Sequence, residues 1–343
     1  MIARSLAVLV MYRRQAAGVA ALVLVLLLVR VYQFKAHVEG PLLLQSAQVL
    51  QVEKGASLTR VLLDLEVQGI LQGAEDVLLY ARFTEFATRM QAGEYELVAG
   101  LTARGLLQLL ASGKVIHHQL SIIEGWTLRQ ALQAIQAHPA ITTTLPLDDP
   151  QALQTAFATE QYPEGLVFPD TYNFTRGTTD VELLQRAHGV MEQTLALSWA
   201  GRDAGLPYGS PYEALVLASI IEKETGLVEE QRHIAGVFVR RLRLGMRLQT
   251  DPTVIYGLGA SFDGNLTRAH LQNDTPWNTY AREGLPLTPI ALPGLGAIEA
   301  SLHPADGDTL YFVARGDGSH YFSATLEQHN QAVRQYQLGE KVP

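Results

Sequence analysis

Hydrophobic and polar positions divide the chain into an apolar N-terminal segment and a long remainder in which the two kinds alternate. Residues 16–29 contain only Ala, Gly, Val and Leu, with Arg14 before the run and Arg30 after it. These two arginines leave 15 residues between them, fewer than the ~20 that a spanning helix needs. An extension that lets Arg30 reach the interface, with Tyr32 as an aromatic anchor, supplies the missing length. The pattern therefore predicts an α-helical transmembrane anchor over residues 16–34.

The charges around this run predict its orientation. Arg4, Arg13 and Arg14 precede it, and no acidic residue lies among them. By the positive-inside rule residues 1–15 form a cytoplasmic tail, and the chain after about residue 35 lies outside. The alternative is a cleaved signal peptide, but the sequence Phe-Lys-Ala-His over 34–37 offers no clean small-x-small cleavage site.

The segment 45–113 has the pattern of a compact α+β unit. A short alternating strand from Val49 is followed by a Gly turn and a helix with Ser57 as N-cap. The remaining elements are a helix near 75–88, a strand at 93–97 and a helix at about 102–112. This order resembles a LysM-like module, the small fold with which many wall proteins hold N-acetyl sugars. The alternative is a plain spacer domain.

A larger mixed α+β region follows over 114–343. Residues 138–151 contain three Pro among Thr and Asp, which is typical of a surface loop. Residues 245–307 hold 14 Gly and Pro, so this stretch is expected to form loops and short strands that carry binding groups. The regular elements expected around these loops are helices over 180–200, 211–225 and 228–244, a hairpin with strands at 310–314 and 320–322, and a final helix over about 325–337.

Composition excludes several classes of protein. A length of 343 residues suggests about two folded units, and a hydrophobic fraction of 48% is enough to bury their cores. The net charge of -8 argues against a nucleic-acid partner held by phosphate contacts. The absence of Cys excludes disulfides, thiolate metal sites and a Cys nucleophile, and the ten His residues show no metal-ligand spacing. No metal and no cofactor are therefore expected.

The helix 211–225 carries the most unusual pattern. Ser210 fits the N-cap, Pro211 fits the first helical position, and Glu213 completes a capping box. The following residues place apolar side chains on nearly every face of the helix, which indicates that the helix is buried. Gly226 is expected to end it.

Two carboxylates close this buried helix. At 100° per residue Glu224 points along the side of Ile220 and Ile221, whereas Glu222 points near Ala218 and a more polar strip. Apolar neighbours and the negative end of the helix dipole both favour a protonated carboxyl, which can protonate a leaving oxygen. Glu224 is therefore the better candidate for a general acid. The alternative is that both are ordinary charges at a helix end, paired with nearby basic side chains.

Longer motifs extend this picture. The chain reads Ala-Ser-Ile-Ile-Glu-Lys-Glu-Thr over 218–225 and Gly-Met-Arg-Leu-Gln-Thr-Asp-Pro-Thr-Val-Ile-Tyr-Gly over 245–257. These motifs resemble the YceG-like family of membrane-bound endolytic murein transglycosylases. Further motifs that match the family are Glu164-Gly165, Phe168-Pro169-Asp170-Thr171-Tyr172, Asn278-Thr279-Tyr280, Gly284-Leu285-Pro286, His303-Pro304-Ala305 and Tyr311-Phe312-Val313-Ala314.

The resemblance implies which residues act. Carried over to this sequence, the catalytic acid is the Glu followed by Thr, which is Glu224. Gln249, Asp251, Asn278 and Tyr280 are the candidates for binding the sugar, because carboxylate, amide and phenol groups suit N-acetyl and hydroxyl contacts. For each of these four the alternative is a turn or cap role. The chain departs from the family after residue 286, where Leu-Thr-Pro-Ile and Leu-Pro-Gly replace Pro-Gly-Pro-Ile and an Asn-Pro-Gly.

The resemblance also implies the reaction and its setting. The family cleaves peptidoglycan glycan strands outside the inner membrane, beside penicillin-binding synthases. The expected products are 1,6-anhydroMurNAc ends, formed by cleavage of the MurNAc–GlcNAc bond of nascent strands and ending their elongation. Hydrolytic glycosidases normally need two carboxylates, whereas a lytic transglycosylase can act with one. The alternatives are a muramidase that uses water and a non-catalytic peptidoglycan-binding scaffold for wall synthases.

The charge pattern around the anchor generates a topology prediction. A reporter enzyme that works only in the periplasm should be active when it is fused after Pro343, and one that works only in the cytoplasm should be inactive there. The reason is that the arginines before the apolar run hold the N-terminus inside. Reporter activity and N-terminal sequencing of the mature protein are the measurements. A mature N-terminus near residue 37 would instead identify the run as a cleaved signal.

Overall fold

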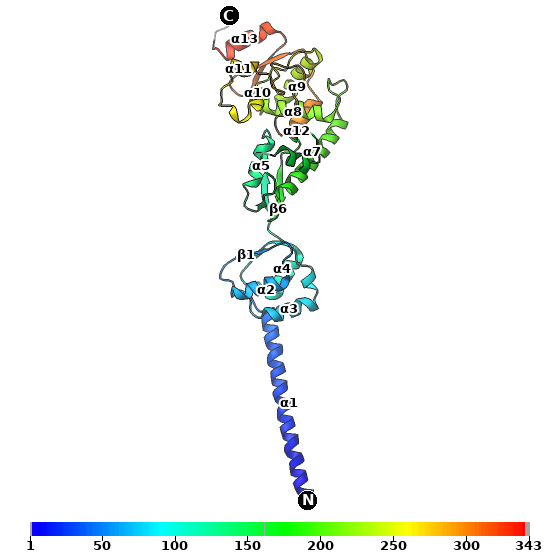
Figure 1. Ribbon diagram of the computed structural model, residues 1–343, viewed down its shortest axis with the longest axis vertical. Coiled ribbons are helices and arrows are strands. Elements are labelled where there is room, and N and C mark those ends of the chain that lie inside the picture. The colour runs from blue at the N-terminus through cyan, green and yellow to red at the C-terminus, as the bar shows by residue number, and fades with distance from the viewer. Residues whose placement is uncertain (1, 148, 161, 340–343) are drawn as a thin grey trace. The chain divides into compact units, whose positions relative to one another are not determined.

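The computed structural model describes residues 2–147, 149–160 and 162–339, without the side chains of residues 2–12 and 87. Much of the expected cytoplasmic tail, Arg4 included, therefore lies outside the described side chains. The chain folds into two compact units of mixed α+β structure (Figure 1). The first comprises residues up to His118 with Thr175–Gly177, and the second comprises Gln119–Phe174 with the residues from Thr178 onward.

The first unit has the order of elements that the sequence predicts, with one difference. The expected helix over 75–88 ends at Phe83, with Thr84 as its C-cap, and a short 3-10 turn follows it. Strands β1 and β2 pair antiparallel, and Tyr95 lies fully buried beneath the helices. The elements are α1 (Ile2–Glu39), β1 (Gln48–Val52), α2 (Leu58–Val67), α3 (Ala74–Phe83), η1 (Phe86–Thr88), β2 (Gly93–Leu97) and α4 (Ala103–Ser112).

Helix α1 combines the apolar run with part of the first unit. Its segment Arg13–Glu39 is long and apolar enough to cross a membrane. The same helix continues without a break into the unit, where Val38 is 2% exposed. Arg30, expected to reach the membrane interface, donates to Asp76 of α3 at 2.8 Å, and His37 Nδ1 lies 2.8 Å from the same carboxylate. The hydrogen bond from Arg30 lowers the pKa of Asp76 to about 2.

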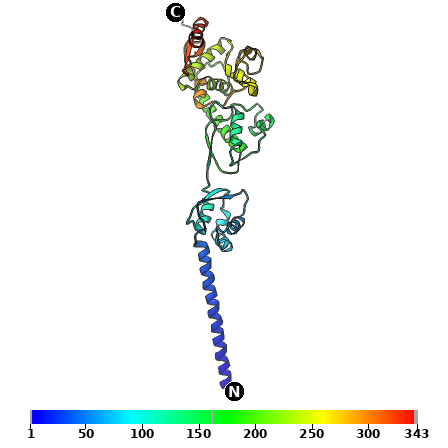
Figure 2. The same ribbon diagram turned by 90° about the vertical axis from the view of Figure 1, so that its left-hand side faces the viewer.

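The second unit is mainly helical, with short two-stranded sheets (Figures 1 and 2). Strand β3 pairs with β5, β4 with β6, and β7 with β8. Its strands are β3 (His118–Ser121), β4 (Ile141–Thr142), β5 (Thr171–Phe174), β6 (Thr178–Thr179), β7 (Tyr311–Ala314) and β8 (His320–Ser323). Its helices are α5 (Leu128–Gln136), α6 (Pro150–Ala156), α7 (Asp180–Ala200), α8 (Pro211–Glu224), α9 (Val228–Arg243), α10 (Asp251–Leu258), η2 (Gly259–Ser261), α11 (Arg268–Gln272), α12 (Leu295–Leu302) and α13 (Leu326–Tyr336).

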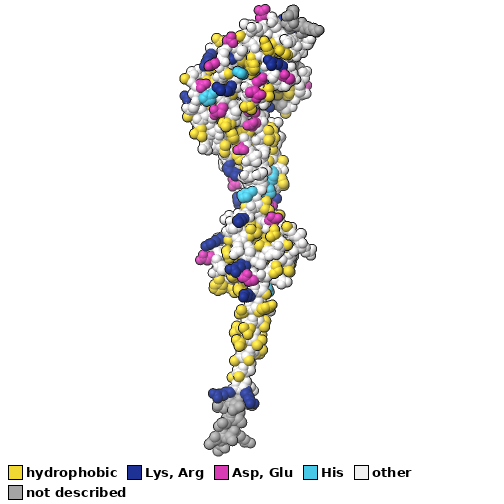
Figure 3. All heavy atoms as spheres, turned by 180° about the vertical axis from the view of Figure 1, so that it is seen from behind, with side chains coloured by type: hydrophobic (Ala, Val, Ile, Leu, Met, Phe, Trp, Pro, Cys, Tyr) yellow, Lys and Arg dark blue, Asp and Glu magenta, His cyan; other side chains and the backbone are white. Residues whose placement is uncertain are grey.

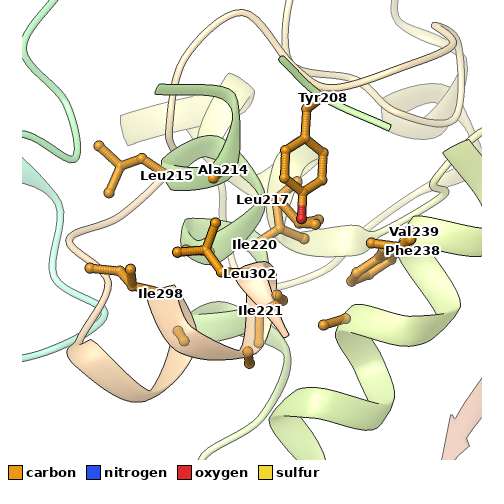
Figure 4. Packing of buried hydrophobic residues seen from close by; sticks show 14 of the residues in the cluster. Tyr208, Ala214, Leu215, Leu217, Ile220, Ile221, Phe238, Val239, Ile298 and Leu302 are labelled. Carbon is orange, nitrogen blue, oxygen red and sulfur yellow. The ribbon is translucent and has the colours of Figure 1, made fainter. Parts of the chain in front are cut away.

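Helix α8 lies at the centre of this unit's core. All eight residues from Ala214 to Ile221 are buried, as the apolar pattern predicts. Helices α7, α9, α10 and α12 pack against it. Figure 4 shows Ile220 and Ile221 of α8 with Phe238 of α9 and Leu302 of α12. A helix surrounded on all sides holds its last turn in a fixed place.

Three local predictions are wrong. The expected loop over 138–151 contains the short strand β4 and the start of α6, where Asp149 caps the helix and Pro150 fits its first turn. The Gly- and Pro-rich stretch 245–307 consists largely of loops, as expected, but it forms the short helices α10, α11 and α12 in place of the expected short strands, because Pro and Gly occupy helix starts, as at Pro252 and Gly294. Gly226 does not stop α8, since the extended backbone of Thr225 already ends it.

The loop that departs from the family motif is fixed against α8 by Ser219. Its hydroxyl donates to Val216 O at 2.7 Å and accepts the buried Ile290 N–H at 3.0 Å. On the loop's other side Gly165 has φ +81°, and a Cβ there would come within 2.5 Å of Pro289. The neighbouring Glu164 accepts bonds from Leu128 N–H and from the Tyr256 hydroxyl of α10, so α10 is held in place as well.

Replacing Ser219 by Ala should loosen this loop. The change leaves Ile290 N–H buried without its acceptor, which costs about 1–3 kcal/mol. Ser301→Ala is the matched control, because the buried Ser301 hydroxyl donates only within its own helix, to Ile298, among the bonds of the described residues. Denaturation followed by tryptophan fluorescence reports this unit, since Trp126, Trp199 and Trp277 all lie in it. Equal losses in the two variants would contradict the proposed cause.

Candidate active site

The candidate acid lies on the last residue of α8. A capping box between Ser210 and Glu213 starts this helix, with Pro in the first turn, as the sequence predicts. The fourteen-residue helix then ends with Glu224, whose carboxyl group accepts a hydrogen bond from the Thr250 hydroxyl. Thr250 is itself fixed, because its N–H donates to Thr279 Oγ1 at 3.1 Å. The carboxyl group is therefore oriented by a buried threonine, while part of the Glu224 side chain stays accessible.

The surroundings of Glu224 favour its neutral form. Burial raises its pKa from 4.5 to about 7, against the opposing effect of the Thr250 hydrogen bond. The nearby charge of Asp251 raises the pKa further, whereas His320 and Arg241 lower it. Near pH 7 the Glu224 carboxyl group is therefore present in both its protonated, proton-donating form and its ionised, proton-accepting form. This is the condition for general acid–base catalysis.

Glu222 lies in a different setting, two residues earlier. Its carboxylate accepts the Gly294 N–H at 3.1 Å and so contacts the N-cap of α12. Burial raises its pKa as well, and the charge of Glu124 adds to the effect. Lys223 between the two glutamates donates to Gly125 O at 3.1 Å. Glu222 therefore holds a backbone turn, a role that differs from that of Glu224.

Three of the four candidate sugar-binding residues lie around the segment that carries Thr250. Gln249 is exposed and has φ +52°, and its N–H donates to Thr279 O at 3.2 Å. Asp251 is the exposed first residue of α10 and accepts the Tyr280 hydroxyl at 2.6 Å. Burial and this carboxylate raise the pKa of Tyr280, which therefore stays a neutral donor. The structure thus brings Gln249, Asp251 and Tyr280 together beside the acid.

Asn278 has a structural position. It is 1% exposed, and its amide nitrogen donates to three carbonyls of residues 270–273. Its amide oxygen accepts the Tyr280 N–H at 2.8 Å. With both ends of the amide in use, this geometry favours a role in shaping the turn that presents Tyr280 over direct contact with sugar.

A partly buried carboxylate–histidine pair near the acid was missed from the sequence. The ring atom Nδ1 of His320 lies 2.7 Å from Glu230 Oε2, and the backbone N–H of His320 donates to Glu230 Oε1 at 3.0 Å. The two side chains are only 11% and 14% exposed. Glu230 lies in the first turn of α9 and His320 begins β8, so 90 residues separate them. No local sequence signal indicates this contact, because the two side chains are so far apart along the chain.

Arg241 supplies positive charge behind the acid. It is 8% exposed and donates to Leu248 O at 2.7 Å and to Leu310 O at 2.7 Å. These bonds tie the segment before Thr250 to the start of β7, and the guanidinium lowers the pKa of Glu224. Within the described residues no three His, Asp or Glu side chains converge as metal ligands.

Comparisons with known proteins agree on one family. The model of the YceG-like family matches residues 50–335. A Bacillus subtilis protein named "Endolytic murein transglycosylase" is 30% identical over 84% of this chain and 84% of its own length. A Streptococcus pneumoniae protein of the same name is 27% identical over 83% of this chain and 57% of its own length. The crystal structure of a protein described as yceG-like from Listeria monocytogenes superposes with a TM-score of 0.54 at 30% identity, over 83% of this chain and 99% of that one. The chain belongs to the YceG-like family.

The contrast between the two glutamates generates a prediction for catalysis. Glu224→Gln keeps the side chain's shape but removes its acidic proton, so activity on murein should fall by roughly 10²–10⁴-fold or more. Glu222→Gln can still accept the Gly294 N–H and should cost much less. Product yield of both variants is the measurement, with circular dichroism as the folding control. A folded Glu224→Gln variant that remains active would contradict the assignment of Glu224 as the acid. If the Glu222→Gln variant were inactive at the same time, Glu222 would be the acid instead.

The hydrogen bond from Thr250 generates a prediction for pH. The acid must be protonated at the start of the reaction, so kcat/KM should fall as pH rises through about 7, the pKa of Glu224. Thr250→Val removes a donor that stabilises the carboxylate, so the fall should move up by about one pH unit. Thr250→Ser keeps the hydroxyl and should leave the profile in place. A downward shift for Thr250→Val would contradict the sign of this interaction.

Proposed function

We propose that the protein is an endolytic lytic transglycosylase of peptidoglycan, a lyase that needs neither metal nor cofactor. The observation that carries the proposal is the Glu224 carboxyl at the end of a buried helix, with its pKa raised to about 7 and its orientation set by Thr250. The names of the relatives from Bacillus subtilis and Streptococcus pneumoniae support the same activity.

In the first half of the proposed reaction Glu224 acts as the acid. Its carboxyl group donates a proton to the oxygen between MurNAc and GlcNAc, the bond from that oxygen to MurNAc C1 breaks, and the GlcNAc side leaves as an alcohol. The MurNAc acetamido group stabilises C1. Because burial, with the nearby charge of Asp251, raises the pKa of Glu224 to about 7, a large fraction of the molecules start the reaction with Glu224 protonated at neutral pH.

In the second half the same group acts as the base. The Glu224 carboxylate takes the proton of the MurNAc C6 hydroxyl, and the C6 oxygen forms a bond to C1. The product is a 1,6-anhydroMurNAc end, and no water is consumed. The Thr250 hydroxyl and the positive charge of Arg241 stabilise the carboxylate between the two steps.

The neighbouring loops are proposed to hold the glycan. Gln249 and Asp251 present exposed amide and carboxylate groups, and Tyr280 presents a phenol next to Asp251. These groups match the hydroxyl and N-acetyl groups of the sugar. Asn278 serves this site through the turn that it holds, so its effect on binding passes through Tyr280.

Asp251 favours one second candidate function, a muramidase that uses water. A hydrolase needs a base or nucleophile beside the acid, and Asp251 is an exposed carboxylate close enough to influence the pKa of Glu224. In that reaction Asp251 activates a water molecule that attacks C1. The products then carry reducing MurNAc ends.

The setting follows from the same proposal. Residues 16–34 anchor the protein once in the inner membrane, with residues 1–15 in the cytoplasm and the remainder in the periplasm. The segment 45–113 is a LysM-like module that holds glycan, and residues 114–343 form the catalytic domain. Cleavage of nascent strands there ends their elongation, beside penicillin-binding synthases.

Digestion of murein tests the proposed reaction. The purified full-length protein is incubated with murein sacculi, and the soluble products are separated and weighed by mass spectrometry. Anhydro ends, which are lighter than reducing ends by one water, are the expected result. Reducing ends that depend on Asp251 would favour the muramidase, and no product from a folded protein would contradict both.

A further inference from the structure

We propose that the first unit rests directly on the lipid bilayer, with the outer face of α3 in contact with the headgroup region. The proposal rests on the proposed membrane anchor but not on the catalytic reaction. It concerns Leu79, Phe83 and the ion pair between Arg30 and Asp76. Together they define what we call the basal face of the unit.

The apolar run is too short to span a bilayer alone. Its 15 residues between Arg14 and Arg30 extend about 22 Å as a helix, whereas the hydrocarbon core is about 30 Å thick. The adjacent arginines 13 and 14 close the run at one end. The bilayer therefore has to reach past Arg30, into the part of α1 where the exposed Tyr32 lies.

The first unit already contacts α1 at this level. Arg30 is the first residue after the run, and its guanidinium is bound to Asp76 in the first turn of α3. Since α1 continues as one helix to Glu39, no flexible segment separates the run from the unit. A bilayer that extends beyond Arg30 must then meet the residues around Asp76. An arginine neutralised by a carboxylate is also better tolerated there than a free one.

Helix α3 presents an apolar face on the side away from the unit's core. Val77 and Ala81 are 0% exposed and point into the core. Leu79 and Phe83 lie on the opposite side of the helix, 43% and 83% exposed. Asp76 is within about 20° of Phe83 around the helix axis, so the face that binds Arg30 is continuous with the apolar one. A solvated helix would carry polar residues at these positions.

The arrangement within the unit agrees with a lipid contact. Figure 1 and, by its colour, Figure 2 place α3 at the end of the unit where α1 enters. Figure 3 shows hydrophobic side chains at this end, together with both basic and acidic ones. The exposed Lys35 of α1 and Arg82 of α3 can meet the phosphate groups of lipids. Aromatic and aliphatic side chains beside basic ones are typical of a surface that lies in the interface.

The chain is well suited to a direct test, because it contains no Cys. Single variants Leu79→Cys and Phe83→Cys of the full-length protein receive a nitroxide spin label and are placed in phosphatidylethanolamine–phosphatidylglycerol vesicles. Val49→Cys, at 57% exposure on β1 of the same unit, is the control for water, and Leu24→Cys, at 58% exposure in the run, is the control for lipid. The measurement is each label's accessibility to oxygen, which prefers lipid, and to a neutral nickel chelate, which prefers water.

The oxygen-to-nickel ratio at positions 79 and 83 should be several-fold above that at 49 and below that at 24. Ratios at 79 and 83 equal to that at 49, with 24 lipid-like, would overturn the basal face and leave the anchor standing. A water-like label at 24 would overturn the anchor and the basal face together, without bearing on catalysis. Shielding of 79 and 83 from both reagents would mean that protein, such as a second copy, covers this face instead.

Discussion

A single carboxyl group at the end of a helix that the core surrounds is the constraint on which the second unit depends. Helix α8 has no polar side along which to bind water, so its last turn stays where the core holds it. The Glu224 carboxyl there is kept largely dry, and Thr250 fixes its orientation. The segment that carries Thr250 is held in turn by Arg241, Thr279 and the contact of Tyr256 with Glu164. Several polar contacts in the unit's interior thus support one acid.

Much of the fold could be predicted because its signals are local. The capping boxes of α8 and α7, the apolar surround of α8 and the turn between β7 and β8 each lie within a few residues of sequence. The stretch 245–307 could not be predicted in the same way. Its Gly and Pro are typical of loops, yet Pro252 and Gly294 stand at helix starts, and only the packing of α10 and α12 against α8 selects that outcome.

The candidate site shows the same contrast between local signals and tertiary contacts. Glu224 could be found from its direction on the helix, since helix geometry converts spacing into facing. Its partners could not, because Thr250, Glu230 and His320 meet through contacts between segments far apart in sequence. Asn278 illustrates the opposite case: an amide that suits a sugar by its chemistry is already saturated by backbone groups. Residue type suggests what a side chain can bind, and only tertiary structure decides whether its atoms are available.

The unbroken course of α1 has a mechanical consequence. A flexible linker would let the first unit turn freely, but a continuous helix bound through Arg30 and His37 to Asp76 transmits torque. If α1 lies in the bilayer as proposed, a neighbouring membrane helix that rotates α1 would rotate the first unit through the same angle. A change in bilayer thickness that tilts the helix would tilt the unit with it. In the proposed membrane-anchored arrangement, rotation or tilt of α1 is therefore passed on to the first unit as a whole.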